Sequence, residues 1–276
     1  MNTDPSMRLA IVERAGTGRD VLSRHLRALG VDIVHLDPAK FTVLPDRDLG
    51  YRSLQLPDID AALWRLPSET YPAMEGIARH LEVSGVLVAN PLSTLETAAD
   101  RRDTMMRLYV AGLKTQPSFG IYPGCTVPAG MTARPALGPG GPVTGVRLAP
   151  AVSVPEDSCA PWTMAAAVDP FDVIHQLVVD GRVVCTYLMN PRRSYFQPSE
   201  TQTQAALTAA EACGALISCV SSTSAGEIIG FDPSPSVPEE FAEAVAADLL
   251  TGLTRLLHER DEGAAQVRPP ALRLVR

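Results

Sequence analysis

The sequence lacks two features that mark large classes of protein. It has no apolar run approaching the roughly 18 continuous residues of a membrane-spanning helix. Its net charge is −7, and no basic cluster precedes the final residues, where Arg268, Arg273 and Arg276 lie. Because nucleic-acid backbones are held by clustered Lys and Arg, we expect neither a membrane protein nor a nucleic-acid-binding protein.

Cysteine is scarce and shows no pairing pattern. The five cysteines form no Cys-x-x-Cys motif and have no paired histidines nearby; they are Cys125, Cys159, Cys185, Cys213 and Cys219. This pattern favours reduced structural thiols over a disulfide framework or a zinc site. The amino terminus carries an acid and a proline where a signal peptide has a basic region and an apolar core. We therefore expect a cytoplasmic protein.

The chain has enough apolar residues, 46% of the total, to bury a core. In its first third, short apolar runs alternate with segments of 3.6-residue apolar period. The expected strands are 9–13, 31–36, 61–66 and 85–89, and the expected helices are 20–29, ended by Gly30, and 68–81, begun by Ser68. This alternation predicts a parallel sheet.

Gly16-Thr17-Gly18 follows the first of these strands, and Asp37 follows the second. The pair partly matches a dinucleotide-binding fingerprint. Val21 takes the place of the third small residue, so the helix could not pack as closely as that fingerprint requires. We interpret the segment as a loop before a helix and expect neither NAD nor FAD.

A more specific pattern lies between residues 89 and 117, where Asn90-Pro91 follows an apolar strand. The positions that continue the pattern are Leu95, Glu96, Asp100, Thr104, Leu108, Gly112 and Pro117. In order and spacing it resembles the RimK-like and LysX-like carboxylate–amine ligases of the ATP-grasp superfamily. The resemblance extends from about Met7 to Glu259. Arg101 stands where that family has a lysine.

The resemblance implies an α+β, ATP-grasp fold. Its parts would be an N-terminal α/β parallel-sheet domain at 1–92, a reduced central lid at 93–165, a C-terminal sheet-and-helix domain at 166–262 and a tail at 263–276. The family activates a carboxylate with ATP and joins it to an amine, with magnesium bound between the phosphates and acidic side chains.

Two arginines stand where the family has phosphate-binding lysines. Arg101 is the first, and Arg134 precedes a glycine-rich loop. The glycines of that loop are Gly138, Gly140 and Gly141. Arginine keeps the charge but replaces a compact ammonium with a planar fork, and Pro139 and Pro142 remove amide donors from the loop. We expect a poorer phosphate cradle than in the family.

The lid should also differ from that of the family. Residues 123–161 contain eight prolines and six glycines, with no run of helical period. The family places two helices there, so we expect a lid of strands and loops that closes less well over a nucleotide. Trp162–Val168 resembles the strand that holds adenine through backbone groups.

Asp180-Gly181 between β-branched runs predicts a hairpin at 178–184. The family carries an Asp-x-Arg signature beside it. Asp172 matches the acid, but the arginine position falls on Ile174 or His175. A lone histidine in an apolar strand is more often a hydrogen-bonded core residue than a catalyst, although His175 stays a candidate acid or base.

Four further elements are expected near the C-terminus: helix 200–213, between Ser199 and Gly214, strands 215–220 and 227–231, and a final helix 237–259. Ser236 and Glu239 predict a capping box for the final helix. Its apolar stripe, which includes Val245, Leu249 and Leu253, predicts packing against the C-terminal sheet.

In this register the family's three metal-binding positions fall on Ser221, Gly230 and Asp232. Hard divalent cations need charged oxygen ligands, and one carboxylate is too few to hold two magnesium ions. A shift of one strand by two residues would bring in only Glu227. Magnesium therefore fits the sequence poorly.

Three interpretations follow. The one we favour is a non-catalytic partner or regulatory subunit, or a homo-oligomer, with an anion or nucleotide pocket lined by Arg101, Arg134, Arg192 and Arg193. The second is an active ligase that uses these arginines in place of lysine and magnesium, with ATP as cofactor. The third is unrelated chemistry in the same cleft, with His175, Asp232 or Arg192 as catalytic residues.

Overall fold

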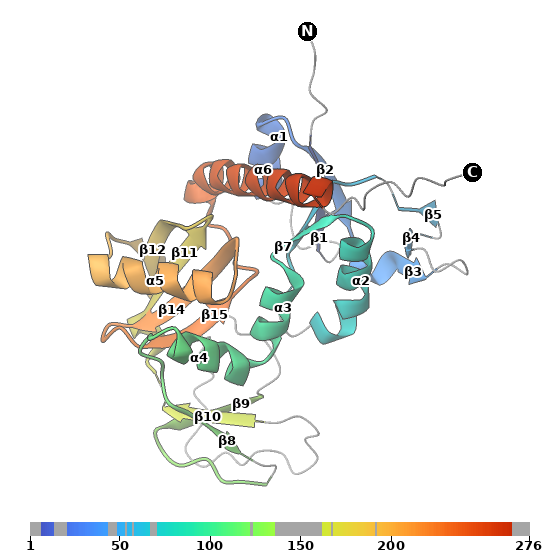
Figure 1. The fold of residues 1–276 in the computed structure, drawn as a ribbon. Coiled ribbons are helices and arrows are strands. Elements are labelled where there is room, and N and C mark those ends of the chain that lie inside the picture. The colour runs from blue at the N-terminus through green and yellow to red at the C-terminus, as the bar shows by residue number, and fades with distance from the viewer. Residues whose placement is uncertain are drawn as a thin grey trace, which may run out of the picture.

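The computed structural model describes residues 7–13, 21–43, 49–52, 54–56, 58–66, 71–121, 124–135, 162–166, 168–190 and 192–266. Figure 1 shows an N-terminal sheet beside the long final helix, a C-terminal sheet with its own helix, and a small sheet at the opposite end from the final helix. The Gly16-Thr17-Gly18 segment lies outside the described residues.

The N-terminal sheet is parallel throughout, as predicted, in the order β2-β1-β6-β7. Its elements are β1 (Arg8–Val12), α1 (Val21–Ala28), β2 (Asp32–Leu36), β6 (Ala61–Trp64), α2 (Tyr71–Val83) and β7 (Leu87–Ala89). Gly30 has a φ of 88°, which favours glycine and ends α1. The side chains of β6 are all buried, because the sheet is covered on both faces.

A small antiparallel sheet between β2 and β6 was not predicted. It contains β3 (Phe41–Val43), β4 (Leu49–Tyr51) and β5 (Leu54–Gln55), and follows a 3-10 turn at Pro38–Lys40. Asp37 caps that turn by accepting a hydrogen bond from the Ala39 amide. Strands of two or three residues are too short to show an alternating pattern in the sequence. An edge-to-face contact of Phe41 with Tyr51 joins β3 to β4.

Two helices follow β7: α3 (Leu92–Ala99) and α4 (Arg101–Val110). They lead into the small lid sheet, whose antiparallel strands are β8 (Ser118–Ile121), β9 (Met131–Pro135) and β10 (Trp162–Ala166), in the order β8-β10-β9. The expected strand 162–168 is therefore present as β10. The proline- and glycine-rich segment 136–161 lies outside the described residues.

The C-terminal sheet has the order β13-β12-β11-β14-β15 and is antiparallel throughout. Its strands are β11 (Val173–Val179), β12 (Arg182–Asn190), β13 (Arg192–Tyr195), β14 (Ile217–Thr223) and β15 (Ile228–Asp232), and α5 (Glu200–Ala212) covers one face. The predicted hairpin turn is present, with positive φ at both Asp180 and Gly181. Ser199 caps α5 through a full capping box, and Gly214 ends it at a φ of 67°.

The predicted start of the final helix was wrong. A 3-10 turn at Glu239–Phe241 comes first, and α6 runs from Ala242 to Gln266. Pro238 precedes that turn without a side-chain cap, so the capping box of Ser236 and Glu239 is not formed. The reason is that the Phe241 amide bonds back three residues to the Pro238 carbonyl, which sets a 3-10 turn instead of an α-helical one.

The apolar stripe of α6 is buried as predicted, but it serves two sheets. Val245, Leu249 and Leu253 are fully buried in one core with Ile11 of β1 and Val179 of β11. This helix therefore packs the N-terminal and C-terminal sheets together, as Figure 1 shows. Within the described part of the chain, we find no helix with the length and apolar content that a membrane crossing needs.

Asn90 provides a second connection between the two sheets. Its side-chain amide donates to the carbonyl oxygens of Ile217 and Pro233, both at 2.7 Å. Its carbonyl oxygen accepts from the amides of Leu216 and Ile217, at 2.7 and 2.9 Å. All the hydrogen-bonding capacity of this fully buried side chain is used, so Asn90 fixes the end of β7 to the end of the β14–β15 pair where β14 begins and β15 finishes.

Candidate functional site

The predicted site positions meet on one face of the C-terminal sheet. Ser221 of β14 lies directly opposite Gly230 of β15 and His175 of β11. His175 in turn lies opposite Tyr187 of β12, and Tyr187 lies opposite Tyr195 of β13. Because directly opposite residues project from the same face, these five positions form a row across the whole sheet, which we call the polar row.

His175 and Ser221 form a buried hydrogen-bonded pair. The His175 Nδ1 and Ser221 Oγ atoms are 3.0 Å apart, and each residue is 2% exposed. Burial, with a smaller contribution from the Arg193 charge, lowers the pKa of His175 to about 4. The imidazole is therefore neutral near pH 7 and stacks on the Tyr187 ring at 5.2 Å. This is the environment expected of a hydrogen-bonded core histidine.

The three positions that correspond to metal ligands do not fit two magnesium ions. Gly230 has no side chain, and the Ser221 hydroxyl is bonded to His175. Asp232 supplies the one carboxylate, and its Oδ1 accepts from the Ser234 amide at 2.9 Å. Among the residues described, no group of three or more His, Cys, Asp or Glu side chains is placed to hold a metal ion.

Glu227, the acid that a shifted register would use, lies just before β15 begins. Its carboxylate pairs with the Lys114 ammonium at 3.2 Å, and its backbone carbonyl accepts from Thr223. The observed register joins Ser221 to Gly230, so Glu227 is not brought to the ligand positions.

Arg101 is buried at the start of α4. It is 7% exposed, and its Nη2 donates to the Ile229 carbonyl at 2.7 Å. The ladder between β14 and β15 pairs Ser221 with Gly230 and Ser222 with Ile228, so Ile229 is the extra residue of a β-bulge. Arg101 therefore donates to the carbonyl of the bulge residue, which has no place in the regular pairing of β14 with β15.

The second phosphate position is only partly described. Arg134 lies in β9 opposite Thr163 of β10, and its side chain is outside the described residues. Gly138, Gly140 and Gly141 also lie outside them. Their part in an anion pocket stays a prediction.

Arg192 and Arg193 lie on β13, a strand that was not predicted. The guanidinium carbon of Arg193 is 5.4 Å from the centre of the Tyr187 ring, within cation–π range, and the residue is exposed. The structure thus brings Arg193, Tyr187, His175 and Ser221 into successive contact. The Arg192 side chain is outside the described residues, and Asp172 lies exposed in the 3-10 turn before β11.

Tyr187 is the residue that sequence reasoning missed. It is 6% exposed, lies between His175 and Arg193, and its hydroxyl is 4.0 Å from the Cys219 sulfur. Burial raises the pKa of Tyr187 well above its usual range, so the hydroxyl stays protonated. The only available signal was its place in an apolar strand after the hairpin. That place does not show which face of the sheet the side chain occupies, because the register shift between Leu177 and Val178 changes the pairing of β11 with β12.

Solved structures place this architecture among known folds. No family model and no curated protein matches the sequence. The RimK-domain ATP-grasp protein of Sphaerobacter thermophilus has a TM-score of 0.63 at 17% identity, over 88% of this chain and 99% of that chain. The D-cycloserine synthetase DcsG has a TM-score of 0.66 at 15% identity, over 91% and 99%. The macrocyclase MdnC, solved with a precursor peptide from Microcystis aeruginosa, has a TM-score of 0.62 at 12% identity, over 89% and 100%. The predicted α+β, ATP-grasp fold is therefore confirmed, and a RimK-domain protein is among the structures that share it.

Proposed function

We propose that this ATP-grasp-fold protein does not carry out magnesium-dependent ligation and acts as a partner or regulatory subunit of another protein. The observation that carries the proposal is the closed polar pair of Ser221 and His175 opposite Gly230. A ligase of this fold would need carboxylates at these positions. The sheet instead has a glycine at one of them, and at another a serine hydroxyl that is bonded to a neutral imidazole.

The chemical reason is charge. Transfer of a phosphoryl group develops negative charge on oxygens, and the enzymes that perform it neutralise that charge with metal ions and fixed cations. One carboxylate, Asp232, cannot hold two divalent cations against the phosphates. Arg101 supports the same conclusion, because one of its guanidinium nitrogens is engaged with the Ile229 carbonyl.

An anion pocket remains part of the proposal. Arg193 is an exposed cation beside the polar row, and Arg192 precedes it on the same strand. Together with Arg134, these arginines are our candidate ligands for a nucleotide or another small anion. Such a pocket would let a ligand regulate the protein without turnover.

The alternative is an active ligase that uses arginines where the family uses lysine. Its support is the fold, because DcsG is a synthetase and MdnC a macrocyclase. The third interpretation, unrelated chemistry at His175 or Asp232, requires access to a histidine that is 2% exposed.

Calorimetric titration with ATP, with and without magnesium, tests the proposal directly. We expect no binding that depends on magnesium and no release of ADP or phosphate when carboxylates and amines are added. An active ATP-grasp ligase in the same assay is the control. Turnover that Arg193→Ala or Arg134→Ala abolishes would overturn the proposal in favour of the ligase. Turnover without nucleotide that His175→Ala abolishes would favour the third interpretation.

A further inference from the structure

One part of the C-terminal sheet has an open edge. β13 pairs with β12 only from Tyr187 to Asn190, and the last bond on that side runs from the Phe196 amide to the Thr186 carbonyl, at 3.1 Å. On its other side, the stretch Arg182–Cys185 pairs with β11 through Arg182, Val183 and Cys185, and Val184 is the extra residue of a β-bulge. In the described part of the chain, no strand continues alongside this stretch. An open edge offers backbone N–H and C=O groups that another extended chain can bind.

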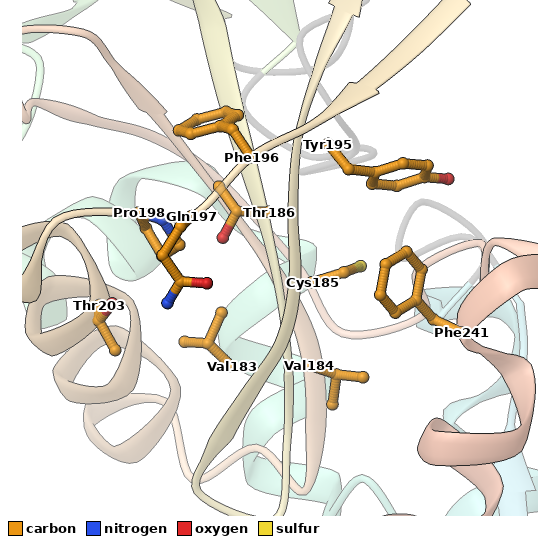
Figure 2. Close-up of a pocket in the computed structure, with 10 residues that line it drawn as sticks. All are labelled: Val183, Val184, Cys185, Thr186, Tyr195, Phe196, Gln197, Pro198, Thr203 and Phe241. Carbon is orange, nitrogen blue, oxygen red and sulfur yellow. The ribbon is translucent and has the colours of Figure 1, made fainter.

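A cavity of about 320 Å³ lies along this edge. Figure 2 shows Phe196, Gln197 and Thr203 on one side of the strand and Tyr195 and Phe241 on the other. Its volume is at the lower end of the range for ligand pockets, roughly 300–1,000 Å³. The cavity therefore has room for a short segment of chain but not for a large cofactor.

A buried hydroxyl without a partner lines this cavity. Thr186 is 2% exposed, and its Oγ makes no hydrogen bond within the protein. In Figure 2 the hydroxyl points into the same space as the Gln197 amide. Buried polar groups are nearly always hydrogen-bonded, so a lone hydroxyl in a cavity wall indicates a ligand that supplies the partner.

The cavity also selects by charge. None of its ten lining residues is an acid, a lysine, an arginine or a histidine. The one ionisable thiol, Cys185, stays protonated, because burial raises its pKa to about 11. A charged ligand would lose hydration there without a charged lining residue to replace it, since the nearby charges of Arg193 and Glu240 lie outside the lining. The lining instead combines aromatic and aliphatic walls with a hydroxyl and an amide, which suits an uncharged peptide.

We propose that the open edge of β12 binds a short, uncharged segment of a partner protein in extended conformation, with its backbone paired to Arg182–Cys185 and a hydrogen bond to the Thr186 hydroxyl. Four residues at about 3.3 Å each give a bound length of about 13 Å. The site does not depend on nucleotide, so it stands whether or not the protein turns over ATP.

The test is a titration of the full chain with the blocked peptide acetyl-Ala-Val-Ala-Val-N-methylamide, followed by the backbone amide resonances in nuclear magnetic resonance spectra. We expect shifts confined to residues 182–186, 196 and 197, because Pro198 has no backbone amide. The comparator is the same peptide with N-methyl groups on alternate backbone nitrogens. It keeps the apolar side chains but loses strand N–H donors, so it should bind at least tenfold more weakly.

Two variants locate the hydrogen bond. Thr186→Val keeps the shape of the side chain and should weaken binding of the blocked peptide about fivefold to tenfold. Ser218→Ala is the matched control, because Ser218 is also a fully buried hydroxyl without a partner but does not line the cavity. It should leave the affinity unchanged. No shifts at these residues up to millimolar peptide, equal binding of the N-methylated peptide, or tighter binding of a charged analogue would each overturn the proposal.

Discussion

The junction at Asn90 and the open edge of β12 handle buried polar groups in opposite ways. At the junction, four hydrogen bonds use every donor and acceptor of the Asn90 side chain. At the edge, the Thr186 hydroxyl has no partner within the protein. The His175–Ser221 pair resembles the junction, since each group bonds the other. The face that carries His175 and Ser221 is therefore held by internal hydrogen bonds, whereas the edge has a buried hydroxyl that no group of the protein bonds.

The largest expected effect comes from opening the junction. Asn90→Ala leaves two buried amides and two buried carbonyls without partners, so we expect the free energy of unfolding to fall by about 4 kcal/mol. Thr94→Val is the comparator, because the Thr94 hydroxyl bonds only the carbonyls at the end of α5, and about 1 kcal/mol is expected. Urea unfolding followed by circular dichroism measures both. Equal losses in the two variants would contradict the central part given to Asn90.

Acid should weaken the polar row through His175. Its folded pKa of about 4 lies below the unfolded value near 6.5, so the unfolded chain binds more protons between these values. The contribution of neutral His175 is fully present above about pH 6.5 and is lost as the pH falls to 4, with a total of about 3 kcal/mol.

His175→Gln should flatten this dependence. His258→Gln is the control, because the His258 side chain is 75% exposed and lies on α6, away from His175 and Ser221. Urea unfolding at pH 4.5, 5.5, 6.5 and 7.5 gives the slopes. A His175→Gln protein that keeps the wild-type slope would show that another group carries the acid sensitivity.

We assign Arg101 a structural role and propose that Arg193 binds an anion, so substitutions at the two positions should have different effects. Arg101→Met keeps most of the buried stem but leaves the Ile229 carbonyl without this donor, so we expect about 2 kcal/mol lower stability. Arg193→Ala changes an exposed side chain and should alter stability by less than about 0.5 kcal/mol, while any anion binding falls. Thermal unfolding and titration with inorganic phosphate separate the two effects. A stable Arg101→Met protein with weakened phosphate binding would reverse the two assignments.

The sequence allowed prediction of those elements whose signals are local. Ser199 before helix 200–213, the Asp180-Gly181 turn and the apolar period of α6 each act within a few residues, and each predicted its element. These features need no knowledge of distant parts of the chain.

Features that depend on long-range contacts could not be read in the same way. Arg101 bonds a bulge that lies 128 residues away, and Asn90 bonds Pro233. The bulges at Val178 and Ile229 change which side chains share a face, and no local pattern marks them. The start of α6 was missed because the Phe241 amide bonds the Pro238 carbonyl, which sets a 3-10 turn before the helix.

The smallest expected effect tests whether the edge hydroxyl is truly unused in the free protein. Thr186→Val replaces a buried hydroxyl without a partner by a methyl group of similar shape, so it should raise the free energy of unfolding by about 1 kcal/mol. Ser218→Ala should leave stability equal or slightly higher for the same reason. Thermal unfolding of both variants without peptide measures this. A loss of more than about 1 kcal/mol for Thr186→Val alone would mean that the hydroxyl is already bonded in solution, and the contrast between the edge and the junction would disappear.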